Sequence, residues 1–113
     1  PLQALQLLND VQHYEAARGL ATRMMKASPE SAARIDFAFK SVLSRAPSSD
    51  EVAIISKLYQ RQLARYQKTP EDAKKAIGFG ESKAPDDLNV PQLAAWTLVA
   101  NLILNMDEAI VRN

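Results

Sequence analysis

The stretch LAAWTLVANLILNM, residues 93–106, decides the fold class of this chain. It carries no charged residue, and its apolar side chains occupy nearly every direction around a helix of 3.6 residues per turn. A soluble helix of this kind must be covered on most of its sides. It is also shorter than the about 20 apolar residues that a membrane span requires. We therefore expect a buried C-terminal helix that other helices cover, with Trp96 in the core.

The rest of the chain carries the signals of those covering helices. Apolar residues recur three and four positions apart, and Pro29 ends one such run because the residue before a proline disfavours the α conformation. Ser48-x-x-Glu51 is a capping box that begins a long helix. Asn9-Asp10 is expected to interrupt the first apolar segment, with Asp10 as the N-cap of the next helix. Before the C-terminal helix we predict helices over residues 1–8, 11–27, 30–44, 48–68 and 70–78.

The length and composition of the chain are those of one globular domain. No β signal is present, so the 113 residues are predicted to form a compact, all-α single domain of five or six helices. The net charge of +1 provides no global field that would attract nucleic acid. The lack of cysteine excludes disulfides, thiolate metal sites and covalent haem attachment through C-x-x-C-H. Because the chain begins with Pro rather than Met, we expect it to be a piece of a longer protein.

Few residues offer chemistry. His13 is the only histidine, and its neighbours three and four positions on are alanines, so no paired metal ligand exists. The GFG sequence at 78–80 lacks the third glycine and the preceding strand of a phosphate loop, and is interpreted as a helix end and turn. The acidic pairs at 86–87 and 107–108 are sequence neighbours rather than carboxyls facing each other across a cleft. We predict no catalytic residue, cofactor or metal site, and do not expect this chain to be an enzyme by itself.

One polar stripe runs along the C-terminal helix. Its members fall on a single face because they are spaced four, four and three residues apart: Thr97, Asn101, Asn105 and Glu108. One interpretation is that the stripe is the narrow solvated edge of a mostly buried helix. The other is that Asn101 and Asn105 are interior and satisfy chain ends or caps of neighbouring helices, since a buried unpaired amide costs about 1–3 kcal/mol.

A basic ridge follows one face of the helix predicted over residues 48–68. It consists of Lys57, Arg61, Arg65 and Lys68, with no acidic residue four positions away from any of them within that helix. The ridge is either a solvated face, favoured by the helix dipole in its C-terminal half, or a contact for an acidic partner. Nucleic-acid binding would also use these cations, but no aromatic residue interleaves them, so we rank this reading last and expect no nucleic-acid partner.

Three segments resemble a known family. They are LQALQLLND near the start, Arg45-x-Pro47-x-x-x-Glu51, and LAAWTLVANLILNMDE near the end. Together they are similar to the C-terminal region of large planctomycete-type proteins, known as domain-of-unknown-function family 1553. The chain departs from that pattern at Val11, where a proline is expected. The resemblance implies a large, exported parent protein, often with a cytochrome-c-like module upstream, and hence a cell-envelope or secreted location. It implies no activity for the residues of this chain.

These observations predict a non-catalytic helical packing or interaction module of a large exported multidomain protein. The alternative is an accessory domain of an envelope enzyme or electron-transfer assembly whose active centre lies elsewhere in the parent. The expected partners are other domains of the parent, and no membrane span is expected in this chain. The candidate interaction or structural residues are the polar residues Asn101, Asn105, Asp107, Glu108, Arg45 and Glu51.

Overall fold

The computed structural model describes the backbone of residues 2–78 and 87–112, and the side chains of residues 14–78 and 87–107. Within these ranges the chain is helical and contains no strand, which confirms the all-α prediction. The described helices are α1 (Leu2–Ala27), α2 (Ser31–Leu43), α3 (Ser49–Lys68), α4 (Pro70–Ile77) and α5 (Val90–Arg112).

The predicted interruption at Asn9-Asp10 is wrong. α1 is one continuous helix of 26 residues, so Asp10 lies inside it and does not cap a second helix. Asn and Asp lower helix propensity by less than about 1 kcal/mol each, whereas a break requires the larger penalty of proline or glycine. The flanking Leu, Gln and Ala residues therefore carry the helix through this position. The described part of the chain accordingly has five helices rather than six.

Local hydrogen bonds set the other helix ends. The capping box of α3 is confirmed, because the Ser48 hydroxyl accepts from the Glu51 N–H at 3.1 Å. Pro70 occupies the first turn of α4, in agreement with the predicted start of this helix, and the preceding Thr69 makes no side-chain cap hydrogen bond to it. Its hydroxyl donates to the Arg65 carbonyl at 2.9 Å and so satisfies the end of α3 instead. Asn89 begins α5 by accepting the N–H of residue 92 at 3.0 Å.

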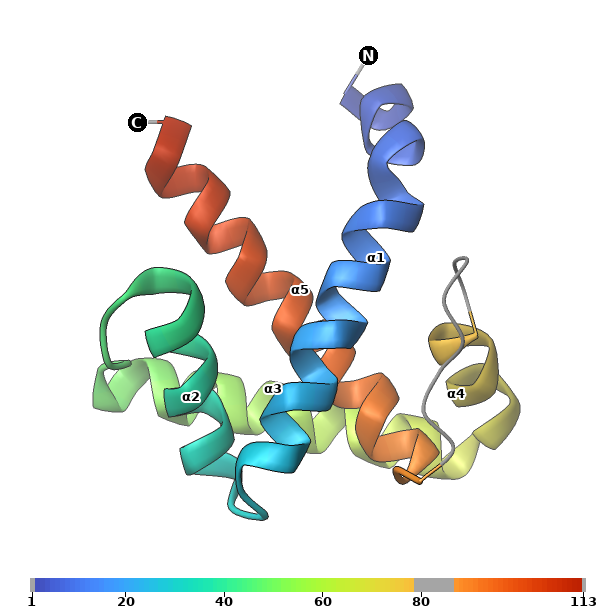
Figure 1. Ribbon diagram of the computed structural model, residues 1–113. Helices are drawn as coiled ribbons and strands as arrows, with labels where there is room; N and C mark the ends of the chain where they lie inside the picture. Colours follow the sequence, from blue (N-terminus) through green and yellow to red (C-terminus); the bar gives the residue numbers. More distant parts are fainter. Residues whose placement is uncertain (1, 79–86, 113) are drawn as a thin grey trace.

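Figure 1 shows how the helices surround α5. The amino-terminal part of α5 crosses the carboxy-terminal part of α1, above a base to which α2, α3 and α4 contribute. α5 contacts each of the other four helices, and α1 most extensively. Beyond this crossing, the amino-terminal half of α1 and the carboxy-terminal half of α5 diverge as two arms (Figure 1).

The core lies where α5 crosses its neighbours. Trp96 is fully buried, as predicted, and its ring stacks on Tyr59 of α3 with centroids 3.9 Å apart. The largest fully buried side chains come from α1, α2 and α5: Trp96, Phe39, Leu20, Met24, Ile35, Leu93, Ile103 and Val99. Leu102, which the all-round apolar pattern also predicts to be buried, is 37% exposed. The apolar pattern overestimates burial here because the other helices leave this side of α5 uncovered, whereas the adjacent Ile103 is fully buried.

Candidate functional site

Arg45 and Glu51 join the end of α2 to the start of α3. The two guanidinium nitrogens Nη1 and Nη2 of Arg45 donate to the two carboxylate oxygens of Glu51 at 2.8 and 2.9 Å. Glu51 also accepts the backbone N–H of Ser48 at 2.8 Å. The guanidinium carbon of Arg45 lies 5.3 Å from the ring centroid of Phe39, within range of a cation–π contact. We call this arrangement the Arg45–Glu51 clasp, which fixes the turn between two helices.

The clasp holds both of its groups in the charged form. The hydrogen bonds from the Arg45 side chain, followed by the Ser48 backbone N–H, lower the pKa of Glu51 from 4.5 to about 2. The same pairing raises the pKa of Arg45. A carboxyl that is ionised throughout the neutral range and engaged on both oxygens is a poor general acid or base. The clasp is therefore a structural element of the interhelical turn.

Acid should weaken the clasp in a defined pH range. Because the pKa of Glu51 is lower in the folded than in the unfolded chain, the pair stabilises the fold above about pH 5, and this contribution is lost as the pH falls towards about 2. We expect Glu51→Gln to lower the melting temperature at pH 7. When melting temperature is plotted against pH, the curves of variant and wild type should converge near pH 2. Circular dichroism melts across this range measure the effect.

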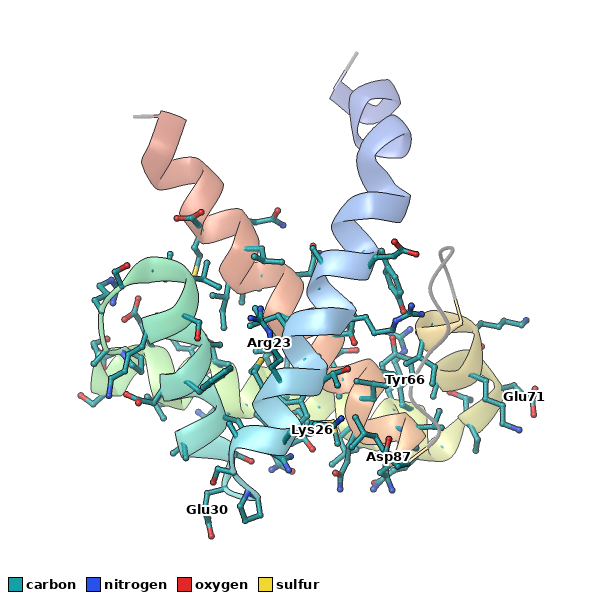
Figure 2. All side chains as sticks on the ribbon, in the orientation of Figure 1. Arg23, Lys26, Glu30, Tyr66, Glu71 and Asp87 are labelled. Carbon is teal, nitrogen blue, oxygen red and sulfur yellow. The ribbon has the colours of Figure 1, made fainter. Side chains whose placement is uncertain are left out.

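Glu71→Gln is the matched control for this experiment. Glu71 points outward from α4 (Figure 2), its side chain is 82% exposed, and its ion pair with Lys74 is long at 3.9 Å. Exposed pairs of this kind contribute little to stability. The plot of melting temperature against pH for Glu71→Gln should therefore stay parallel to that of the wild type. A Glu51→Gln curve that also ran parallel from pH 7 to pH 2 would contradict the proposed role of the clasp.

The polar stripe of α5 does not form a single environment. Thr97 is buried, and its hydroxyl donates to the carbonyl four residues earlier at 2.7 Å. Asn101 and Asp107 are half-buried and Asn105 is exposed, so the interior interpretation is wrong for Asn105. Within the described part of the chain, neither asparagine bonds a cap of another helix. The side chain of Glu108 lies outside the described residues.

Two leucines are exposed beside these asparagines. Leu98 and Leu102, one helical turn apart on α5, are 36% and 37% exposed. At 100° per residue, the directions of Leu98, Asn101, Leu102 and Asn105 fall within about 100° of one another. We call these four residues the α5 face. The sequence-based interpretation missed the two leucines because an all-round apolar pattern does not show which side of a helix stays uncovered.

Two arginines bind the carboxyl ends of helices. The buried Arg18 of α1 donates to the Ile77 carbonyl at the end of α4. Arg34 of α2 donates to the carbonyls of Ser28 and, at 3.3 Å, Met25 at the end of α1. The last carbonyls of a helix have no partner within it and carry its negative partial charge, which favours cations there. These arginines connect α1 with α4 and α2 with α1.

The sequence contained one signal for the buried arginine. Arg18 lies between the apolar residues Ala17 and Leu20 of the segment predicted to be helical over residues 11–27, and an arginine buried there requires partners. Burial also raises the pKa of the nearby Tyr14 to about 12, so its hydroxyl stays neutral at physiological pH. The hydrogen bond across 59 residues to α4 could not be read from local spacing.

The amino-acid sequence of this chain matches a family model. Residues 1–59 match the family PSD1, protein of unknown function (DUF1553), which is more than half of the chain. The chain belongs to the DUF1553 family. No curated protein and no solved structure matches it.

The DUF1553 match runs from the start of α1 to Tyr59 in the middle of α3. It includes the segment with Arg45 and Glu51, so the clasp belongs to the matched part of the chain. The whole of α5, with Asn101, Asn105 and Asp107, lies beyond the matched residues. The structure thus brings two of the candidate residues into contact and places the others along α5.

The candidates for chemistry remain dispersed in this DUF1553 chain. Among the described side chains, no three His, Cys, Asp or Glu residues gather as a metal site would require. The side chain of His13 and residues 79–86 lie outside the described part, while Asp87 is exposed just before α5 (Figure 2). Gly78 ends α4 as predicted. None of the helices, as far as the structure describes them, is long and apolar enough to cross a membrane.

Proposed function

We propose that this DUF1553 chain is a non-catalytic packing and interaction module of a larger exported protein, and that its α5 face contacts another domain of that protein. The observation that carries the proposal is the exposure of Leu98 and Leu102 together, one helical turn apart on α5. Burying a leucine side chain fully is worth about 1.5–3 kcal/mol, so a contact that covers both leucines would be stabilised.

The chemistry of the α5 face favours a protein domain as its partner. Asn101 and Asn105 lie beside the leucines, and their amides require hydrogen-bond partners if they are covered. Lipid tails offer none, whereas a protein surface supplies both apolar area and polar groups. Interfaces between domains of one chain are typically more polar than obligate subunit interfaces. A mixed leucine and asparagine face is consistent with such a contact.

Chemical labelling can test the contact directly. The chain has no cysteine, so Leu102→Cys introduces a single thiol on the α5 face. We expect a maleimide to label it several-fold more slowly in the intact parent protein than in the isolated chain. Ala33→Cys, at an exposed position of α2, is the matched control and should label at similar rates in both. Equal labelling of Leu102→Cys in both proteins would refute the proposed interface.

A further inference from the structure

Four cations lie exposed along one face of α3. We call them the α3 ridge: Lys57, Arg61, Arg65 and Lys68. Their spacing of four, four and three residues keeps them within about 80° of one another around the helix. At 1.5 Å per residue the ridge extends for about 16 Å along α3. It is a straight track of positive charge on the outside of the molecule.

The described residues leave most of this charge uncompensated. Arg65 donates to the Gln62 side chain at 3.0 Å and lies over the ring of Tyr66 at 4.8 Å. Lys57, Arg61 and Lys68 have no hydrogen bond or ion pair with any residue in the described ranges. The cations of the described ion pairs lie elsewhere: Lys40 with Asp36, Arg45 with Glu51 and Lys74 with Glu71.

The helix itself does not account for the whole ridge. Arg65 and Lys68 occupy the last turn of α3, where the helix dipole stabilises positive charge. Lys57 and Arg61 lie further from the end, where the effect of the dipole has largely decayed. The like charges at 57/61 and 61/65 are four residues apart and therefore repel each other. A partner that brings negative charge would remove this repulsion.

An apolar side chain continues the ridge towards the amino-terminus of α3. Ile54, three residues before Lys57 on the same face, is 66% exposed, more than any other large hydrophobic residue described. Asp50 follows one further turn away, at the start of the helix. One exposed isoleucine is too little apolar surface for membrane insertion, which requires an entire helix face. No aromatic residue interleaves the cations as a platform on which nucleic-acid bases could stack.

We propose that the α3 ridge and Ile54 bind an acidic helical segment of a partner protein. Carboxylates repeating every three or four residues on a partner helix would match the four cations, and an apolar side chain at one end would cover Ile54. The proposal rests on the proposed function only in treating this chain as an interaction module. It concerns a different helix from the α5 face, so either surface can fail its test independently of the other.

A synthetic peptide can serve as the probe. It carries glutamates every three or four residues on one helical face, with one leucine at the end of that row, and its binding to the full chain is measured by fluorescence anisotropy. We expect binding that weakens with salt. The double variant Lys57→Glu/Arg61→Glu should reduce the affinity by at least about tenfold, because it replaces attraction by repulsion over the amino-terminal half of the ridge. Ile54→Ala should lower the affinity for this peptide, but not the affinity for a second peptide in which the leucine is replaced by alanine.

Two exposed cations of α1 provide the control. Arg23→Glu/Lys26→Glu changes the net charge by the same amount but leaves the α3 ridge intact (Figure 2). It should retain nearly all of the affinity. Equal losses in both double variants, or no binding of the glutamate peptide to the wild type, would overturn the proposal. Tighter binding to a single-stranded oligonucleotide or to phosphatidylglycerol vesicles would also overturn it, in favour of a nucleic acid or a membrane. Circular dichroism confirms that each variant is folded.

Discussion

Trp96→Ala is expected to destabilise the chain by about 3–5 kcal/mol, the usual cost of removing a large buried aromatic side chain. The indole is fully buried, stacks on Tyr59, and lies 5.8 Å from the guanidinium carbon of Arg34. It therefore connects α5 to both α3 and α2. Because single domains are typically stable by only about 5–15 kcal/mol, this one substitution should leave the fold marginal.

Denaturant unfolding measures this loss of stability. It is followed by far-UV circular dichroism because Trp96 is the only tryptophan, so the variant has no tryptophan fluorescence to report unfolding. Trp96→Phe is the matched control. It keeps an aromatic ring that can stack on Tyr59, so its loss should be clearly smaller. An unfolding midpoint for Trp96→Ala equal to that of the wild type would show that the residue lies outside the core.

Ile103→Ala should cost about 2–5 kcal/mol, whereas Leu102→Ala should cost about 1 kcal/mol or less. The two residues are sequence neighbours on the same helix and lose aliphatic side chains of equal size. They differ in environment, because Ile103 is fully buried and Leu102 is 37% exposed. The pair therefore tests which side of α5 faces the core.

Urea unfolding of both variants decides the question. The reverse order of losses would mean that α5 is rotated by about one residue, or 100°, about its axis. Such a rotation would also turn Leu98 and Asn105 away from their present directions. The same experiment thus examines the α5 face on which the proposed interdomain contact depends.

Features that depend on residues close in sequence could be predicted well. The capping box of Ser48 and Glu51, the start of α4 at Pro70 and its end at Gly78 are all confirmed. Each is decided by a hydrogen bond or a backbone restriction within a few residues, so the tertiary structure adds nothing to it. The predicted break at Asn9-Asp10 failed because a modest loss of propensity does not stop a helix without proline or glycine.

The core stripes of the amphipathic helices were equally predictable. Ile35, Ala38 and Phe39 of α2 and Ile55 and Tyr59 of α3 are buried, in agreement with their helical spacing. An amphipathic helix has one apolar side, and burial of that side is the dominant favourable term in folding. The sequence therefore determined the all-α class, the helix boundaries near strong signals, and the inward faces of these two helices.

Only the tertiary structure decided which part of α5 stays uncovered and where the arginines donate. An all-round apolar helix such as α5 has no preferred side in its sequence, so the exposure of Leu98 and Leu102 depends on which side its neighbours leave uncovered. Arg18 reaches a carbonyl 59 residues away, a contact that exists only once α1 and α4 have packed. Local spacing specifies the faces of a helix, but the partners of those faces follow from the arrangement of all five.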